Sequence, residues 1–147
     1  MMLNTYSHFT NKSKQTLPSS THTKLPTSSL SLTLLLVDDN PINLQLLRKT
    51  LLAIFKVRHM DLATNGYQAL RLLEQRHYDA ILLDIDMPGM NGIETTEIIR
   101  QRPSSSSPIP SVLDLNRSIP ILAVTTNDSS ESRRIYENVG MVRRLPQ

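Results

Sequence analysis

Apolar and polar positions from residue 32 onward follow a pattern that switches repeatedly between two periods. Short continuous apolar runs of strand length are each followed by a longer stretch in which apolar residues recur at helical spacing. Strands are expected at residues 32–37, 57–63, 79–84, 119–124 and 141–145, and helices at residues 41–55, 65–76, 92–102 and 129–140. The alternation predicts an α/β fold in which five parallel strands form a doubly wound sheet.

Residues at the predicted element boundaries agree with this pattern. Asn40 is suited to cap the first helix, and Pro41 fits its first turn because proline lacks an N–H that would be unsatisfied there. Pro88 and Gly89 set a tight turn after the third strand, and Asn91 is suited to cap the third helix. We therefore expect short connections at these places.

Two segments interrupt the regular pattern. Residues 1–31 are rich in Ser and Thr and show no apolar periodicity, which is typical of a disordered tail. Residues 103–118 are rich in Ser and Pro and form a connection longer than the usual span of about 2 to 6 residues. We predict one domain over residues 32–147 that carries a disordered insertion at about residues 103–118.

Charge and composition exclude several classes of protein. The net charge of +3 comes from Lys12, Lys14 and Lys24 in the tail, because thirteen basic residues and thirteen acids balance in the remainder. A basic face for nucleic acid is therefore not expected in the folded part. The chain has no cysteine, which excludes disulfides and thiolate metal sites. No apolar run reaches the length of about 18 residues that spans a membrane, and no secretory signal begins the chain, so the default location is intracellular.

Acidic residues follow two of the predicted strands directly. Asp38 and Asp39 come after the first strand, and Asp84 ends the third. The carboxyl ends of parallel strands meet at one edge of a sheet, where such folds bind their ligands. Carboxylates held close together repel one another unless a cation joins them. Since Mg²⁺ prefers oxygen ligands, the sequence predicts a magnesium site at this edge.

With these residues in view, the chain resembles the receiver domain of two-component response regulators. The resemblance rests on "LLLVDDNPIN" with Asp38 and Asp39, on "ILLDIDMPGMNG" with Asp84, and on "IPILAVTTN" with Thr125. The "VDDNPIN" stretch is similar to receivers of hybrid histidine kinases and eukaryotic phosphorelays. The resemblance implies the flavodoxin-like receiver fold over the predicted domain.

The resemblance also implies a function. Asp84 would accept a phosphoryl group from a phosphohistidine on a histidine kinase or a histidine phosphotransfer protein, and Thr125 would supply the switch hydroxyl. For Mg²⁺, Asp39 would bind directly, Asp38 through water, Asp84 through one oxygen and Asp86 through its backbone carbonyl. The chain would be a signalling module of the cytoplasm or nucleus and not an enzyme, with neither nucleic acid nor membrane as a partner.

Two positions depart from the family pattern. Gln147 stands where the family has a lysine, Arg144 stands where it has the switch aromatic residue, and the final helix of the fold is not expected within this chain. Two alternatives therefore stay open. The first is a receiver-like protein-binding module that does not signal. The second is a phosphohydrolase of the haloacid-dehalogenase type, with Asp84 as nucleophile and Asp86 as acid and base, although in that family the acid pair lies on the first strand.

Overall fold

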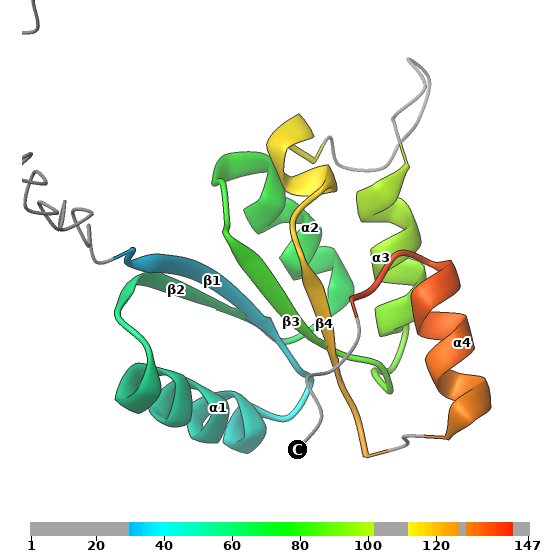
Figure 1. Cartoon of the computed structure of the whole chain (residues 1–147), viewed down its shortest axis with the longest axis horizontal. Coiled ribbons are helices and arrows are strands. Elements are labelled where there is room, and N and C mark those ends of the chain that lie inside the picture. The colour runs from blue at the N-terminus through cyan, green and yellow to red at the C-terminus, as the bar shows by residue number, and fades with distance from the viewer. Residues whose placement is uncertain (1–29, 102–111, 127–128, 143–147) are drawn as a thin grey trace, which may run out of the picture.

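A computed structural model of the chain describes residues 30–101, 112–126 and 129–142. Its centre is a parallel sheet with the strand order β2-β1-β3-β4 (Figure 1). The strands are β1 (Leu32–Val37), β2 (Val57–Ala63), β3 (Ala80–Asp84) and β4 (Ile121–Val124). The predicted α/β class and the parallel pairing are confirmed, with β1 and β3 at the centre of the sheet.

Helices cover the two faces of the sheet. They are α1 (Pro41–Ile54), α2 (Gly66–Gln75), α3 (Gly92–Arg100) and α4 (Ser130–Asn138), with a short 3-10 helix η1 (Asp114–Arg117) before β4. Figure 1 shows α1 on one side of the sheet and α2 and α3 on the other, with α4 beside α3. The described elements alternate as a doubly wound fold requires.

Asparagine side chains begin the first three helices. The Asn40 side chain accepts a hydrogen bond from the Ile42 N–H at 2.9 Å, directly before Pro41. Asn91 and Glu94 form a reciprocal capping box at the start of α3. Such caps satisfy N–H groups that have no partner within the helix. The sequence-based assignments of Asn40 and Asn91 are confirmed.

The main hydrophobic core lies on the α2 and α3 side of the sheet. Leu35, Val37, Ile81 and Leu83 point into it from the two central strands and are at most 2% exposed. Alternate residues of β1, such as Leu34 and Leu36, face α1 instead, because side chains along a strand point to opposite faces. β1 is therefore buried on both sides, which explains its continuous apolar sequence, whereas alternate residues of β3 are only partly buried.

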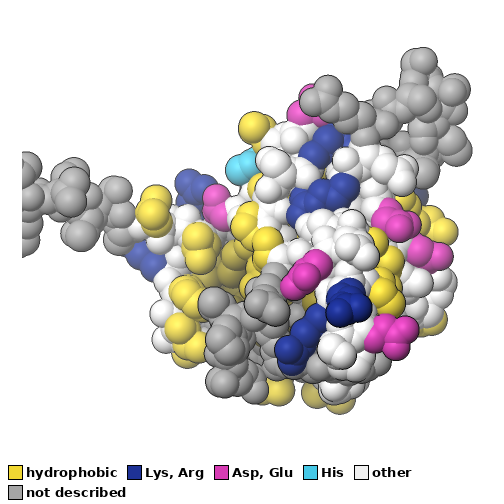
Figure 2. All heavy atoms as spheres, turned by 45° about the vertical axis from the view of Figure 1, so that its right-hand side comes forward, with side chains coloured by type: hydrophobic (Ala, Val, Ile, Leu, Met, Phe, Trp, Pro, Cys, Tyr) yellow, Lys and Arg dark blue, Asp and Glu magenta, His cyan; other side chains and the backbone are white. Residues whose placement is uncertain are grey.

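Helix α1 buries fewer of its side chains than α2 or α3. Leu44 is its buried residue, whereas several of its large apolar side chains are exposed: Ile42, Leu46, Leu52 and Ile54. Figure 2 shows hydrophobic side chains gathered toward the left of that view, while α4, which comes forward, carries mainly charged and polar groups. Among the described residues of α4 none is buried. Among the described residues, α1 therefore carries a large share of the exposed apolar side chains.

Part of the predicted insertion is built into the fold. Residues 112–118 contain η1, and Asn116 within it is 0% exposed. The Asn116 side chain accepts from the Tyr78 N–H at 3.0 Å and donates to the carbonyls of Leu73 and Arg76. Because these hydrogen bonds satisfy three backbone groups, the segment is ordered despite its Ser- and Pro-rich surroundings. The rest of the predicted insertion, residues 103–111, lies outside the described residues.

The expected fifth strand is reduced to a single contact within the described residues. Val142 forms an isolated parallel bridge with Leu122 of β4. Residues 143–147, which include Arg144 and Gln147, lie outside the described part of the chain, as does most of the predicted tail. Among helices built from the described residues, none combines the length and apolar character needed to cross a bilayer.

Candidate functional site

Three carboxylates meet at the edge of the sheet where the strands end. The register pairs Val37 of β1 with Leu83 of β3, so the residues that follow, Asp38 and Asp84, lie side by side. Asp39 joins them, and one carboxylate oxygen from each of the three lies within 4.8 Å of the others. Asp38 is 5% exposed, Asp84 is partly buried and Asp39 is exposed. The predicted convergence of these acids is confirmed.

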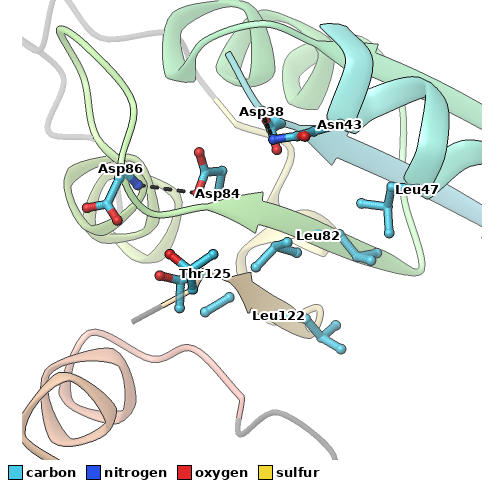
Figure 3. A pocket seen from close by; sticks show the side chains of 11 residues that line it. Asp38, Asn43, Leu47, Leu82, Asp84, Asp86, Leu122 and Thr125 are labelled. Atoms are coloured by element: carbon cyan, nitrogen blue, oxygen red, sulfur yellow. Dashed lines mark hydrogen bonds between the residues drawn. The ribbon is translucent and has the colours of Figure 1, made fainter. Parts of the chain in front are cut away.

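Hydrogen bonds in the loop after β3 fix the position of the Asp86 backbone relative to the Asp84 carboxylate. The Asp86 N–H donates to the Asp84 Oδ1 at 3.4 Å, and the Gly92 N–H donates to the Ile85 carbonyl at 3.0 Å. Gly89 has a φ of 77°, a left-handed conformation that favours glycine at this turn. Figure 3 shows the Asp86 carboxylate directed away from Asp84. The backbone of Asp86, and not its side chain, therefore faces the acid cluster.

Gly92 allows the start of α3 to approach the site closely. A Cβ at this position would collide with the Asp84 carbonyl oxygen and would come within 2.9 Å of the Ile85 Cα. Since both neighbours are backbone atoms, they could not move without displacing the loop. The sequence analysis missed this role because the sequence does not show that the backbone of Asp84 and Ile85 lies against the first residue of α3.

The surroundings of Asp84 raise the pKa of its carboxyl. Burial raises the pKa of the Asp84 carboxyl above its usual range, and the neighbouring charges of Asp38 and Asp39 raise it further, while hydrogen bonds from the Asp86 and Ile85 backbone partly oppose them. A carboxyl with this raised pKa has more to gain from a cation than an exposed one. The three acids are therefore suited to a hard divalent ion.

A pocket of about 590 Å³ opens beside the acids. Asp38, Asp84 and Asp86 line one part of it, and Thr125, which directly follows β4, lines another. Its remaining wall is largely apolar and includes Leu47 of α1, Leu82 of β3 and Leu122 of β4 (Figure 3). The structure thus brings Thr125 and the acid cluster to one cavity, although they are far apart in the sequence.

Asn43 is a polar residue of this pocket that the sequence analysis did not identify. It lies in the first turn of α1, and its Nδ2 donates to the Asp38 Oδ1 at 3.3 Å. The Asn40 N–H donates to the same oxygen at 2.8 Å. The spacing of Asn43 after Asp38 and Asp39, about one helical turn beyond Asn40, was the signal that could have revealed it.

Comparison with protein families gives one match across most of the chain. The family model of the response regulator receiver domain matches residues 34–146. Stress response regulator protein 1 of Lodderomyces elongisporus is 32% identical over 107 residues, which are 73% of this chain and 26% of that protein. Signal transduction histidine-protein kinase BarA of Shigella flexneri is 35% identical over 114 residues, which are 78% of this chain and 11% of that protein. The chain therefore spans only a small part of the length of these relatives.

Solved structures give the same result. Chemotaxis response regulator CheY4 of Vibrio cholerae superposes with a TM-score of 0.63 at 26% identity, covering 76% of this chain and 82% of that one. The receiver domain of sensor histidine kinase PA1611 from Pseudomonas aeruginosa superposes with a TM-score of 0.60 at 31% identity, covering 76% of this chain and 81% of that one. That structure has a magnesium ion coordinated in its active site cleft.

Proposed function

The chain belongs to the response regulator receiver domain family, and from this premise we propose that Asp84 accepts a phosphoryl group from a phosphohistidine donor. The observation that carries the proposal is the cluster of three carboxylates, with Asp84 partly buried between its neighbours and Thr125 on the same pocket. Receiver domains act as signalling modules, so the phosphorylated form would be the signal.

The residues present fit Mg²⁺. Every candidate donor is a hard oxygen, and burial together with the charges of Asp38 and Asp39 raises the pKa of Asp84, which a bound cation would relieve. We assign Asp39 as a direct ligand, Asp38 as a ligand through water, Asp84 as the donor of one oxygen and Asp86 as the donor of its backbone carbonyl. When bound, the ion would neutralise charge on the phosphoryl oxygens. The magnesium ion in the PA1611 receiver supports this assignment.

The proposed transfer is a substitution at phosphorus. An Asp84 carboxylate oxygen forms a bond to phosphorus as the bond between phosphorus and the donor's imidazole nitrogen breaks, and the electron pair of that bond leaves with the imidazole. A carboxylate is a weak nucleophile, so the site contributes position and charge neutralisation. The Thr125 hydroxyl would donate a hydrogen bond to a phosphoryl oxygen and so report phosphorylation to the segment after β4.

The donor that fits this chemistry is a histidine kinase or a histidine phosphotransfer protein. We propose an intracellular location, in the cytoplasm or nucleus, because phosphohistidine donors are formed there from ATP. No nucleic acid or membrane is part of the proposed activity. The domain we assign to this function is residues 32–147, with residues 1–31 as a tail.

Two positions outside the described residues affect the expected strength of the signal. A lysine at the position of Gln147 would place a positive charge on the phosphoryl group, whereas glutamine offers a neutral N–H, and hydrogen bonds to charged groups stabilise by roughly 1.5 to 3 kcal/mol against about 1 kcal/mol for neutral ones. Arg144 stands in place of the switch aromatic residue. We therefore propose that phosphorylation of this chain is weaker than in receivers that have both residues.

The two alternatives are less well supported. A phosphohydrolase of the haloacid-dehalogenase type would need the Asp86 carboxylate as acid and base, yet this side chain is directed away from Asp84. A binding module that does not signal would not require the acid cluster and Thr125 to lie on one pocket. Neither alternative accounts for the pocket as well as phosphoryl transfer does.

The proposal is tested by incubating the full chain with acetyl phosphate and Mg²⁺ and measuring its intact mass. We expect one base-labile phosphoryl adduct, which should be lost in Asp84→Asn because the amide oxygen is a poor nucleophile. Asp114→Asn is the matched control, since this carboxylate is exposed and lies in η1 away from the site. Equal labelling of Asp84→Asn and the parent chain would overturn the proposal.

A further inference from the structure

Asn43 links helix α1 to the acid cluster by a hydrogen bond between side chains. Its Nδ2 donates to the Asp38 Oδ1 at 3.3 Å, and the Asn40 N–H donates to the same oxygen at 2.8 Å. Figure 3 shows the Asn43 side chain extending from α1 toward Asp38. One oxygen of the Asp38 carboxylate is therefore held by two donors from the segment that begins α1.

These two hydrogen bonds leave the Asp38 Oδ2 as the oxygen that can face a ligand. Asp38 is 5% exposed, so its carboxylate has little room to turn. With Oδ1 committed to Asn40 and Asn43, Oδ2 is the oxygen left to serve a ligand. A carboxylate with one oxygen held in this way keeps a single orientation, and holding ligands in one orientation is how outer groups tune a metal site.

We propose that Asn43 is a positioning residue that orients Asp38 and thereby sets the affinity of the acid cluster for a divalent cation. The inference rests on the ion site of the proposed function, and it assigns to Asn43 a role that acts through Asp38. Removing such an outer group typically weakens metal affinity by about 10- to 100-fold. We expect the lower figure, about 10-fold, because the Asn40 N–H would remain on the same oxygen and because Asp38 is assigned to reach the ion through water.

A purely structural role for Asn43 predicts a different outcome. Asn43 is exposed, so replacing it opens no cavity in the core. Alanine is also a better helix former than asparagine, which offsets the lost hydrogen bond. We therefore expect Asn43→Ala to melt at nearly the same temperature as the parent chain without metal, while it binds the ion more weakly.

The experiment titrates the metal-free full chain with Mn²⁺ and measures free Mn²⁺ by electron paramagnetic resonance. Mn²⁺ suits the same carboxylate and carbonyl ligands as Mg²⁺. Asn43→Ala and Asn43→Leu both lack the donor, and Leu also keeps the branched shape at Cγ, so both should bind about 10-fold more weakly. Asn43→Gln keeps the amide and should regain part of the affinity. Gln45→Ala, a neighbouring polar residue that lines a different depression on α1, should bind as the parent does.

Three outcomes would overturn the inference. Equal affinity in Asn43→Ala and the parent would show that the amide does not position Asp38. Tighter binding in Asn43→Ala would show that the amide competes with the ion for the carboxylate. Absence of Mn²⁺ binding by the parent chain would also overturn it, together with the proposed ion site.

A second measurement separates this inference from the proposed function. Labelling by acetyl phosphate at rising Mg²⁺ should reach the same maximal rate in Asn43→Ala and in the parent, with the half-saturating Mg²⁺ concentration raised about 10-fold in the variant. If Asp84 is not labelled at all while the difference in Mn²⁺ affinity is found, the proposed phosphoryl transfer fails and the role of Asn43 stands.

Discussion

At the scale of single residues, the protein places an acid where its charge is unfavourable without a ligand. Burial raises the pKa of the Asp84 carboxyl, and Asp38 and Asp39 raise it further. A group whose pKa is raised by folding contributes most to stability below the pKa of the unfolded chain, and that contribution is lost as the pH rises through the raised value. Ionised Asp84 therefore lowers the stability of the metal-free protein at neutral pH.

Replacing Asp84 by Asn should for this reason raise the melting temperature of the metal-free protein at neutral pH. The gain should shrink as the pH falls toward the ordinary aspartate value of 3.8, where the parent carboxyl becomes neutral as well. With Mg²⁺ added, the parent should melt at a higher temperature than Asp84→Asn, because the parent gains stability by binding the ion and the variant lacks one ligand.

Thermal unfolding followed by circular dichroism, with and without Mg²⁺, measures this effect. Asp114→Asn serves as the control and should change neither melting temperature, since Asp114 is exposed and pairs only with Arg117 among the described ion pairs. A lower melting temperature for metal-free Asp84→Asn at neutral pH would contradict the account of the acid cluster.

Which site residues could be predicted from the sequence depends on what determines their position. Asp38 and Asp84 follow parallel strands, so the strand pattern alone places them at one edge. Asn43 was missed because its role depends on the direction of one side chain in the first turn of α1. The assignment of Asp39, Asp86 and Thr125 to specific roles came from the family resemblance and stays a prediction.

At the scale of elements, the fit of α3 against the end of β3 fixes the geometry of the site. Gly92 begins α3 at a distance from Asp84 that leaves no space for a Cβ. The capping box of Asn91 and Glu94 holds the same end of the helix. The loop that carries Asp86 is thus confined between β3 and α3.

Gly92→Ala should push the start of α3 away from the backbone at the end of β3. Forcing a methyl group against backbone atoms should lower the free energy of unfolding by about 3 kcal/mol, at the upper end of the usual cost of overpacking. It should also reduce labelling by acetyl phosphate, since the Asp86 carbonyl would shift. Gly89→Ala is the comparison, because its Cβ would meet nothing within 4 Å and it should cost only about 1 kcal/mol for the left-handed backbone.

Urea unfolding, followed by circular dichroism, gives both free energies. The account of the α3 contact fails if Gly92→Ala proves as stable as the parent, or if Gly89→Ala costs more than Gly92→Ala.

Most elements could be predicted from the sequence because their apolar periodicity is strong, and the predicted strand at residues 32–37 matches β1. The 3-10 helix η1 was not predicted. Its order comes from Asn116, whose three hydrogen bonds reach Leu73, Arg76 and Tyr78 far along the chain, and local composition carries no sign of such contacts. The last predicted strand shows only the bridge at Val142 within the described residues.

At the scale of the whole molecule, the sheet and core found among the described residues begin with β1. Leu30, just before β1, is 84% exposed, and the core cluster begins at Leu35. We propose that residues 32–147 are the receiver domain and that residues 1–31 are a tail that does not contribute to its stability.

Deleting residues 1–29 should therefore change the free energy of unfolding by no more than about 0.5 kcal/mol, as for changes at an uninvolved surface. Replacing residues 103–111 by a shorter linker should have a similarly small effect, because halving a loop changes its closure entropy by only about 0.6 kcal/mol.

Asn116→Ala is the contrasting variant and should lower the free energy of unfolding by about 3 kcal/mol, because it leaves buried backbone groups unpaired. Urea unfolding tests all three, and a loss of cooperative unfolding after either deletion would contradict the proposed domain boundary.

The central claim is that Asp84, and no other carboxylate, receives the phosphoryl group. The most direct measurement treats the full chain with acetyl phosphate and Mg²⁺, reduces the product with borohydride and maps the modified residue by peptide mass spectrometry, since reduction of an aspartyl phosphate leaves homoserine. The account predicts homoserine at position 84 alone, dependent on both acetyl phosphate and Mg²⁺. Homoserine at position 38, 39 or 86, or none at position 84 under conditions that reduce a known aspartyl phosphate, would contradict it.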